Sequence, residues 1–116
     1  MTRPVLIVED EAIIALDLAD ILRAAGYSVV GPEKSVSAAL MQAKVSRLHA
    51  AILDIKLGLE LVYPVADVLA ATRIPFVFST SQTVDELPAR HRGKPFIRKP
   101  YEPRNLLEAL SNATAV

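Results

Sequence analysis

The stretch VLIVEDE, residues 5–11, consists of four apolar residues followed at once by three carboxylates. Four more short apolar runs follow it, at residues 28–31, 50–53, 75–78 and 95–97. None of these runs alternates with polar residues, as expected for parallel strands covered by helices on both faces. The sequence therefore predicts five parallel strands, the first of them over residues 4–8.

Amphipathic stretches separate the apolar runs, and their apolar residues recur with helical spacing. They predict helices over residues 14–25, 36–43 and 62–70, and a last helix that starts at Pro103. Ser35 is placed to cap the second helix. The helical pattern fails over residues 82–93, where we expect a short or irregular fourth helix. This order of strands and helices indicates an α/β fold with an open parallel sheet, either flavodoxin-like or half of a Rossmann fold.

Composition narrows the class of protein further. The 116 residues fit one domain, and the absence of cysteine excludes disulfide scaffolds, zinc ribbons and thiol nucleophiles. A formal net charge of zero argues against nucleic acid or a membrane surface as partner. The apolar run near the N-terminus is too short for a signal peptide or a membrane span, so we expect a soluble, cytoplasmic protein.

Basic residues gather near the C-terminal end. Residues 90–104 contain six lysines and arginines and only one acidic residue. A run of this kind is either a solvated surface or a surface that docks a partner with acidic residues.

Polar side chains stand directly after the predicted strands, where α/β sheets of this kind carry their chemistry. Glu9 and Asp10 follow the first strand and Asp54 follows the third, so three carboxylates are expected to meet at one edge. Their mutual repulsion favours a hard divalent cation, and oxygen ligands alone indicate Mg²⁺. Thr80 and Lys99 follow two further strands and could bind a phosphoryl group, with Asp54 as its nucleophilic acceptor.

Each of these residues also has an ordinary structural interpretation. Glu9 and Asp10 could favour a helix N-terminus, and Asp54 could be a turn residue. Thr80 could equally be a turn hydroxyl and Lys99 a solvated charge. Their joint placement after four different strands favours the phosphoryl site.

The sequence resembles the receiver domain of response regulators, the CheY-like family, over its whole length. The resemblance is carried by VLIVEDE at residues 5–11, AAILDIKLG at 50–58 and PFIRKPYE at 95–102. It implies a flavodoxin-like fold with strand order 2-1-3-4-5 and Asp54 as the phosphorylation site. It also implies that Mg²⁺ is held by Glu9, Asp10, Asp54 and the backbone carbonyl of Lys56. By the same resemblance Thr80 is the switch hydroxyl, Lys99 the phosphoryl-binding lysine, and Phe96 the aromatic residue that changes rotamer on activation.

Residues 54–80 are similar to a narrower group, the single-domain "FAT GUY" receivers of alphaproteobacteria, which carry a PFxFATGY strand. That resemblance implies a histidine kinase of the HWE or HisKA_2 class as partner. Two features depart from the group or from ordinary receivers. Residues 79–82 are Ser-Thr-Ser-Gln, and Lys56 places a cation two residues after the phospho-acceptor.

The function implied is that of a single-domain response regulator without an output domain. It would accept a phosphoryl group on Asp54 from a histidine kinase or phosphotransfer protein. It would then signal to a downstream protein through the fourth helix, fifth strand and last helix, pass the phosphoryl group on, or drain it from a kinase. Beyond its own phosphorylation and dephosphorylation it would not be an enzyme. The alternative is a phosphorylation-impaired receiver that acts as a constitutive docking module. A dehalogenase-type phosphatase is disfavoured, because it requires an acid where this chain has Lys56.

Overall fold

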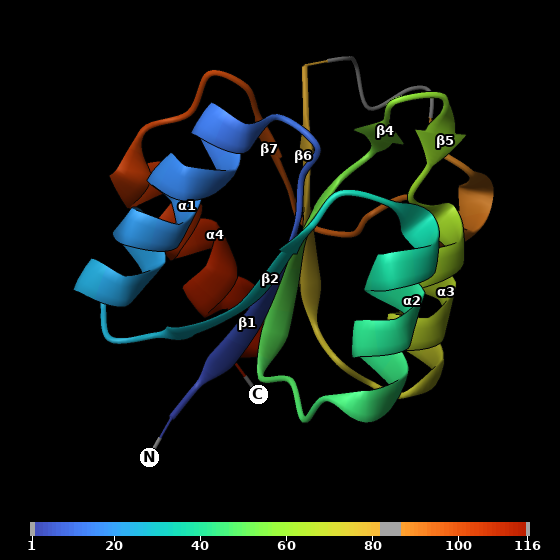
Figure 1. Cartoon of the computed structure of the whole chain (residues 1–116), viewed down its shortest axis with the longest axis horizontal. Helices are drawn as coiled ribbons and strands as arrows, with labels where there is room; N and C mark the ends of the chain where they lie inside the picture. Colours follow the sequence, from blue (N-terminus) through green and yellow to red (C-terminus); the bar gives the residue numbers. More distant parts are fainter. Residues whose placement is uncertain (1, 82–86, 116) are drawn as a thin grey trace.

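The computed structural model describes residues 2–81 and 87–115. Its main sheet has five parallel strands in the order β2-β1-β3-β6-β7 (Figure 1). These strands are β1 (Pro4–Val8), β2 (Ser28–Glu33), β3 (Ala50–Asp54), β6 (Phe76–Thr80) and β7 (Phe96–Arg98). The predicted flavodoxin-like sheet is confirmed, including the strand order 2-1-3-4-5 counted within this sheet.

Helices cover both faces of the sheet. The helices α1 (Ala12–Ala24) and α4 (Pro103–Thr114) lie on one face, and α2 (Val36–Val45) and α3 (Tyr63–Ala71) lie on the other (Figure 1). Ser35 caps α2 by accepting a hydrogen bond from the Ala38 N–H. Within residues 2–81 and 87–115, no helix combines the length and apolar character that a membrane span requires.

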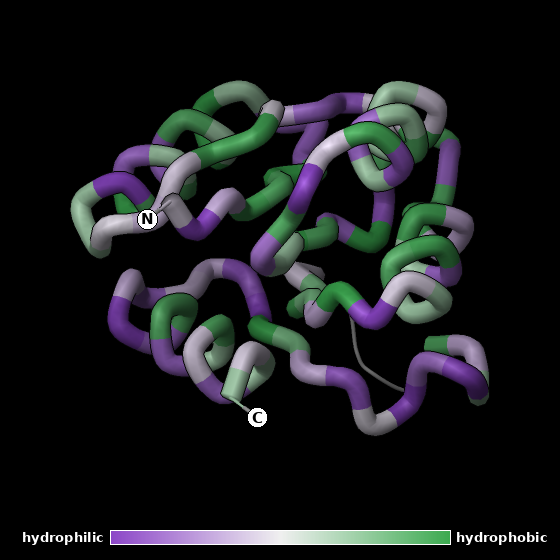
Figure 2. Tube along the Cα trace, turned by 90° about the horizontal axis from the view of Figure 1, so that it is seen from below, coloured by the Kyte–Doolittle hydropathy of each residue, from purple (hydrophilic) through white to green (hydrophobic). Residues whose placement is uncertain are grey.

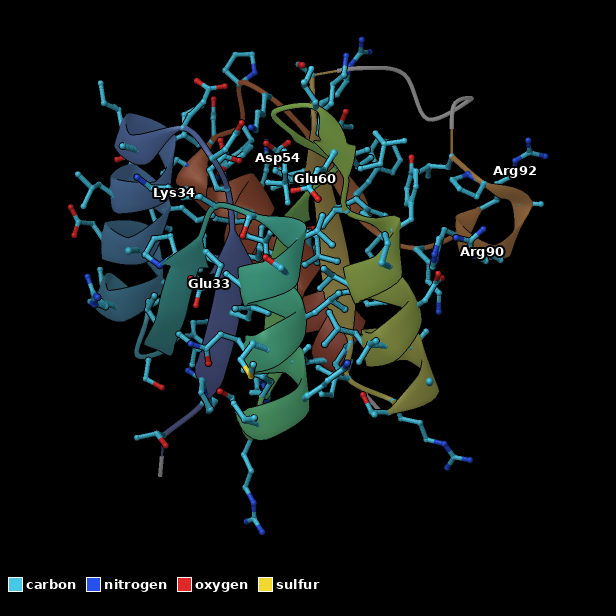
Figure 3. All side chains as sticks on the ribbon, turned by 45° about the vertical axis from the view of Figure 1, so that its right-hand side comes forward. Glu33, Lys34, Asp54, Glu60, Arg90 and Arg92 are labelled. Atoms are coloured by element: carbon cyan, nitrogen blue, oxygen red, sulfur yellow. The ribbon has the colours of Figure 1, made fainter. Side chains whose placement is uncertain are left out.

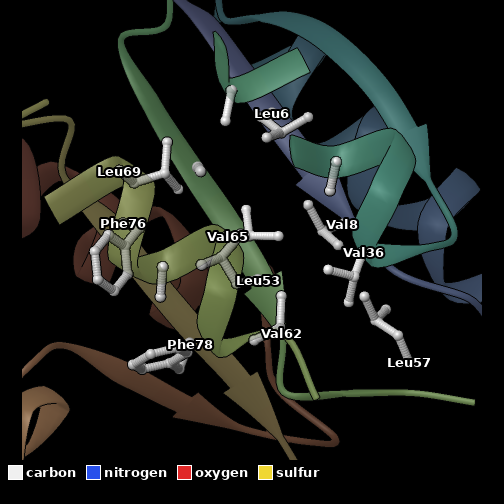
Figure 4. Packing of buried hydrophobic residues seen from close by; sticks show 14 of the residues in the cluster. Leu6, Val8, Val36, Leu53, Leu57, Val62, Val65, Leu69, Phe76 and Phe78 are labelled. Carbon is white, nitrogen blue, oxygen red and sulfur yellow. The ribbon is translucent and has the colours of Figure 1, made fainter. Parts of the chain in front are cut away.

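Successive residues of the strands point to opposite faces, so the sheet separates two hydrophobic cores. Leu6, Leu53 and Phe78 pack with α2 and α3 (Figure 4). Ile7 and Val77 belong to the second core, which is completed by α1 and α4. Figure 2 shows hydrophobic residues along the central strands between the helices. Burial on both faces explains why the apolar runs show no alternation.

The expectation of a short or irregular fourth helix is confirmed in its described part, and one other segment differs from the expectation. The described part of the predicted fourth helix contains one 3-10 turn, η2 (Ala89–His91), while residues 82–86 lie outside the described residues. A small antiparallel hairpin, β4 (Lys56–Leu57) and β5 (Glu60–Leu61), follows β3 and was not predicted. Its turn contains Gly58 at φ 59°, a left-handed conformation that glycine adopts at little cost.

Candidate functional site

Three carboxylates meet at the carboxyl edge of the sheet. Glu9 and Asp10 follow β1, and Asp54 ends the neighbouring strand β3. One carboxylate oxygen from each of the three lies within 4.8 Å of the others. Glu9 and Asp54 are buried and Asp10 is partly exposed. The structure thus brings together the three acidic residues predicted to hold a metal ion.

Lys99 extends into this cluster from the end of β7. Its Nζ donates hydrogen bonds to both carboxylate oxygens of Glu9, at 3.0 Å each, and lies 3.5 Å from Asp54 Oδ1. Burial alone would lower the pKa of Lys99, but the bond to Glu9 and the charges of Asp54 and Glu9 together raise it. Lys99 is therefore a charged ammonium group directed at the predicted phospho-acceptor.

The surroundings of Asp54 disfavour its negative charge. Burial, a hydrogen bond with Glu9 and the Glu9 charge raise the pKa of Asp54 to about 7, and Lys99 offsets these effects only in part. Additional positive charge at the cluster would therefore stabilise the ionised form of Asp54. Converging carboxylate oxygens are the ligands that Mg²⁺ takes in proteins, so the donor set fits a hard divalent cation.

The β4–β5 hairpin closes one side of the cluster. The Gly58 N–H donates a 2.8 Å hydrogen bond to Asp10 Oδ2, which leaves Asp10 Oδ1 for another partner. Lys56 lies in β4 with an exposed side chain. A metal contact through its backbone carbonyl stays a prediction. The sequence pattern missed this hairpin because its strands have only two residues each; the glycine in the run KLGLEL was the available signal.

Thr80 and Phe96 occupy neighbouring strands beside the cluster. Thr80 is the buried last residue of β6, and its carbonyl accepts a 2.8 Å hydrogen bond from the Lys99 N–H. Ser79, which pairs in register with Asp54, is also buried, and its hydroxyl has no hydrogen-bond partner within residues 2–81 and 87–115. Phe96 pairs in register with Phe78 and is 40% exposed, so its ring lies outward in this structure.

A cleft of about 520 Å³ opens beside Lys99, between the start of α1 and the residues that follow β6 and β7. Ile13, Ile14 and Tyr101 form part of its apolar lining. Ile13 is 83% exposed, which is high for an isoleucine. Burial and the charges of nearby carboxylates raise the pKa of Tyr101 to about 12, so its hydroxyl stays protonated. The cleft gives a partner an apolar surface close to Asp54.

Solved structures place this arrangement in a known family. The solution structure of SdrG from Sphingomonas melonis matches with a TM-score of 0.86 and 38% identity, and covers 98% of both chains. SdrG in its BeF3-activated conformation matches with a TM-score of 0.82. A signal receiver domain of a modulated diguanylate cyclase from Desulfovibrio desulfuricans matches with a TM-score of 0.85 and 31% identity, and covers 98% of this chain and 94% of that one. The chain belongs to the receiver-domain family of response regulators.

Further comparisons match the chain with a receiver domain of a sensor histidine kinase and with two regulatory proteins. The receiver domain of the sensor histidine kinase PA1611 from Pseudomonas aeruginosa, solved with a magnesium ion in its active-site cleft, shares the fold (TM-score 0.85, 21% identity, 98% of both chains covered). The transcriptional regulatory protein PdtaR from Mycobacterium tuberculosis is 32% identical over 97% of this chain. The phyllosphere-induced regulator PhyR from Methylorubrum extorquens is also 32% identical over 97%. This chain spans 57% and 44% of the lengths of these two relatives. No protein-family model matches the chain.

Proposed function

We propose that this receiver accepts a phosphoryl group on Asp54 from a phosphohistidine of a histidine kinase or phosphotransfer protein. The proposal rests on one observation, the convergence of Asp54, two further carboxylates and the Lys99 ammonium at one edge of the sheet. A purely structural ion pair would not require three acidic groups around one lysine. Such an excess of carboxylates is expected where a cation and a phosphoryl group bind.

The reaction assigns a role to each of these side chains. A carboxylate oxygen of Asp54 attacks phosphorus, the P–N bond breaks, and the donor imidazole, protonated on its other ring nitrogen, leaves as neutral imidazole. Lys99, 3.5 Å from Asp54 Oδ1, stabilises the charge of the transferred oxygens. Thr80 offers a hydroxyl from the neighbouring strand end. Glu9, Asp10, Asp54 and the Lys56 carbonyl would hold Mg²⁺, which supplies charge neutralisation when bound.

The donor protein would dock on the cleft beside Lys99. A histidine kinase or phosphotransfer protein must bring its phosphohistidine to Asp54, and this cleft adjoins Asp54 through Lys99. The exposed Ile13 and Leu16 on α1 add apolar contact area. The HWE or HisKA_2 kinase class is proposed from the sequence resemblance alone.

The downstream surface would be formed by η2, β7 and α4. Phe96 is exposed there, together with Arg92, Arg98 and Arg104. This combination favours a protein partner with acidic residues. As alternatives, the phosphorylated receiver would pass its phosphoryl group to another protein, or would serve only to remove phosphoryl groups from a kinase.

Acetyl phosphate tests the proposed chemistry without requiring the donor protein. The chain is incubated with acetyl phosphate, with and without Mg²⁺, and its intact mass is measured. We expect one added phosphoryl group that requires Mg²⁺ and is absent from Asp54→Asn. If neither acetyl phosphate nor a panel of phosphorylated histidine kinases labels the chain, the proposal fails. The constitutive docking module is then favoured.

A further inference from the structure

A second charged cluster lies between α3 and the turn η2, away from the carboxylate edge. Asp67 on α3 accepts hydrogen bonds from Arg90 Nε at 2.8 Å and Arg90 Nη2 at 3.1 Å. His91 Nε2 lies 2.9 Å from Asp67 Oδ1. Figure 3 shows Arg90 on the turn beside α3. One aspartate thus binds two consecutive residues of the segment that precedes β7.

His91 occupies a pocket of aromatic rings. It is 2% exposed, stacks on Tyr63 with 5.8 Å between ring centroids, and meets Phe76 and Phe78 edge-on at 6.1 and 5.6 Å. Its Nδ1 is buried without a hydrogen-bond partner among the described residues. Among the residues that the structure describes, the ring is therefore held by aromatic packing and by one polar contact, which goes to Asp67.

The rest of the segment over residues 87–93 is held mainly by its own turns. The backbone N–H groups of His91 and Arg92 donate to the carbonyls of Pro88 and Ala89, within the segment. The Arg92 Nε also donates internally, to the Leu87 carbonyl. Leu87 itself is buried against the core. The contacts of Asp67 therefore provide the polar attachment that we observe between this segment and α3.

This attachment is weak enough to open and close reversibly. Asp67 and Arg90 are 44% and 57% exposed, and ion pairs exposed to water contribute little to stability. The Arg90 bonds and the His91 contact hold the pKa of Asp67 below its usual value, since both stabilise the carboxylate. Such a contact keeps a segment in place and still allows it to open.

The segment also lies between β6 and β7, the strands that end at Thr80 and just before Lys99. Phe76 and Phe78, which pack on His91, belong to β6, and β6 ends at Thr80 beside Asp54. Movement of Thr80 toward a phosphoryl group would shift the strand end that carries this aromatic packing. Beyond the segment, the exposed Phe96 lies next to Phe78 in register.

We propose that Asp67, Arg90 and His91 form a latch that closes residues 87–93 over the rings of Tyr63, Phe76 and Phe78. Opening of the latch exposes these rings beside Phe96, which enlarges the apolar surface offered to a downstream protein. Phosphorylation favours the open form, a step that rests on the proposed function of Asp54. The latch itself does not depend on that chemistry.

Limited proteolysis with trypsin measures opening directly, because Arg90 and Arg92 are cleavage sites inside the segment. The rate of cleavage follows the open population when opening and closing are fast. Asp67→Ala removes both contacts without weakening helix α3, since alanine favours helices. We expect cleavage after Arg90 and Arg92 to rise about fivefold, as for the loss of an ion pair at the upper end of the range for exposed pairs. Asp20→Ala, the same change on the exposed face of α1, should leave the rate unchanged.

Cleavage after Arg23, within α1, reports whether the variant is globally unfolded and serves as the internal reference. His91→Phe keeps a ring in the aromatic pocket but removes the contact to Asp67, and a smaller acceleration is expected. The latch is disproved if Asp67→Ala and the control are cleaved after Arg90 at the same rate. It is also disproved if cleavage after Arg23 accelerates equally.

Beryllium trifluoride with Mg²⁺, which mimics an acyl phosphate, tests the coupling to Asp54. We expect a several-fold faster cleavage after Arg90 in the unmodified chain and little further change in Asp67→Ala, because its latch is already open. Binding of the mimic, followed by fluorine NMR, without any change in cleavage overturns the coupling. Absence of binding counts against the proposed function instead, while the comparison without the mimic still decides on the latch.

Discussion

Lys99 donates two hydrogen bonds to the carboxylate of Glu9, at 3.0 Å each, across 90 residues of sequence. The two side chains are only 14% and 3% exposed, so water does not screen the pair effectively. The same ammonium group lies 3.5 Å from Asp54. One lysine therefore provides the nearest positive charge for two buried carboxylates.

Removal of that lysine should destabilise the protein. Lys99→Met leaves Glu9 buried without its partner, and the loss of one member of a buried pair costs about 3–5 kcal/mol. Urea unfolding in EDTA measures the change. Lys34→Met, at an exposed lysine, is the matched control and should change the free energy of unfolding by less than about 0.5 kcal/mol. Equal stabilities of the two variants would show that Glu9 does not need Lys99.

Replacement of Asp54 should stabilise the protein at neutral and alkaline pH in EDTA. The pKa of Asp54 is raised to about 7 in the folded chain, chiefly by burial. As pH rises from about 4 to about 7, the unfolded chain releases this proton and the folded chain retains it, so stability declines. Asp54→Asn lacks this decline, and its advantage should grow from near zero at about pH 4 to roughly 4 kcal/mol at about pH 8. A pH-independent difference would contradict this account.

Mg²⁺ should raise the melting temperature through the three carboxylates. At about 100 times its dissociation constant, a ligand that binds only the folded state stabilises it by about 2.7 kcal/mol. Asp10→Asn should abolish most of this shift, while its amide oxygen can still accept the Gly58 N–H. Thermal melts with increasing MgCl₂ measure the effect, with Asp20→Asn as control. An undiminished shift in Asp10→Asn would exclude Asp10 as a ligand.

Two phenylalanines that pair in register should respond very differently to truncation. Phe78 is fully buried, so Phe78→Ala should cost about 3–5 kcal/mol through lost burial and a cavity. Phe96 is 40% exposed, and Phe96→Ala should cost about 1 kcal/mol. Urea unfolding of both variants compares them directly. A cost for Phe96→Ala equal to that of Phe78→Ala would indicate that its ring lies inward in solution.

The fold could be predicted because the apolar runs and helical spacings are long enough to be specific. Ser35 and Pro103 mark two helix starts, by capping and by tolerance of a missing N–H, and the structure confirms both. The ends of the strands were predicted less accurately than the helix starts. For example, β2 extends to Glu33, beyond its predicted end at Gly31, since local pattern does not encode the register with β1.

The sequence predicted that three carboxylates meet at one edge of the sheet, but not the hydrogen bonds that surround them. The order of strands brings Glu9, Asp10 and Asp54 together in any sheet of this kind. By contrast, the Gly58 contact to Asp10 depends on a hairpin with two-residue strands. The Asp67 contacts to Arg90 and His91 join residues 23 and 24 positions apart through irregular backbone, which no periodicity reveals. Membership of the PFxFATGY-type group stays a prediction.

The acidic cluster and the surface around Phe96 should tolerate substitutions to different degrees, because their strands occupy different positions in the sheet. The carboxylates come from β1 and β3, which lie inside the sheet, whereas Phe96 lies on β7 at its edge. Substitutions in β1 or β3 disturb both cores and the acidic cluster together. Changes on the outer side of β7 and in the segment before it would alter the proposed downstream surface without touching the three carboxylates. Related chains could therefore acquire new downstream partners, by evolution or by design, while keeping the proposed phosphoryl chemistry.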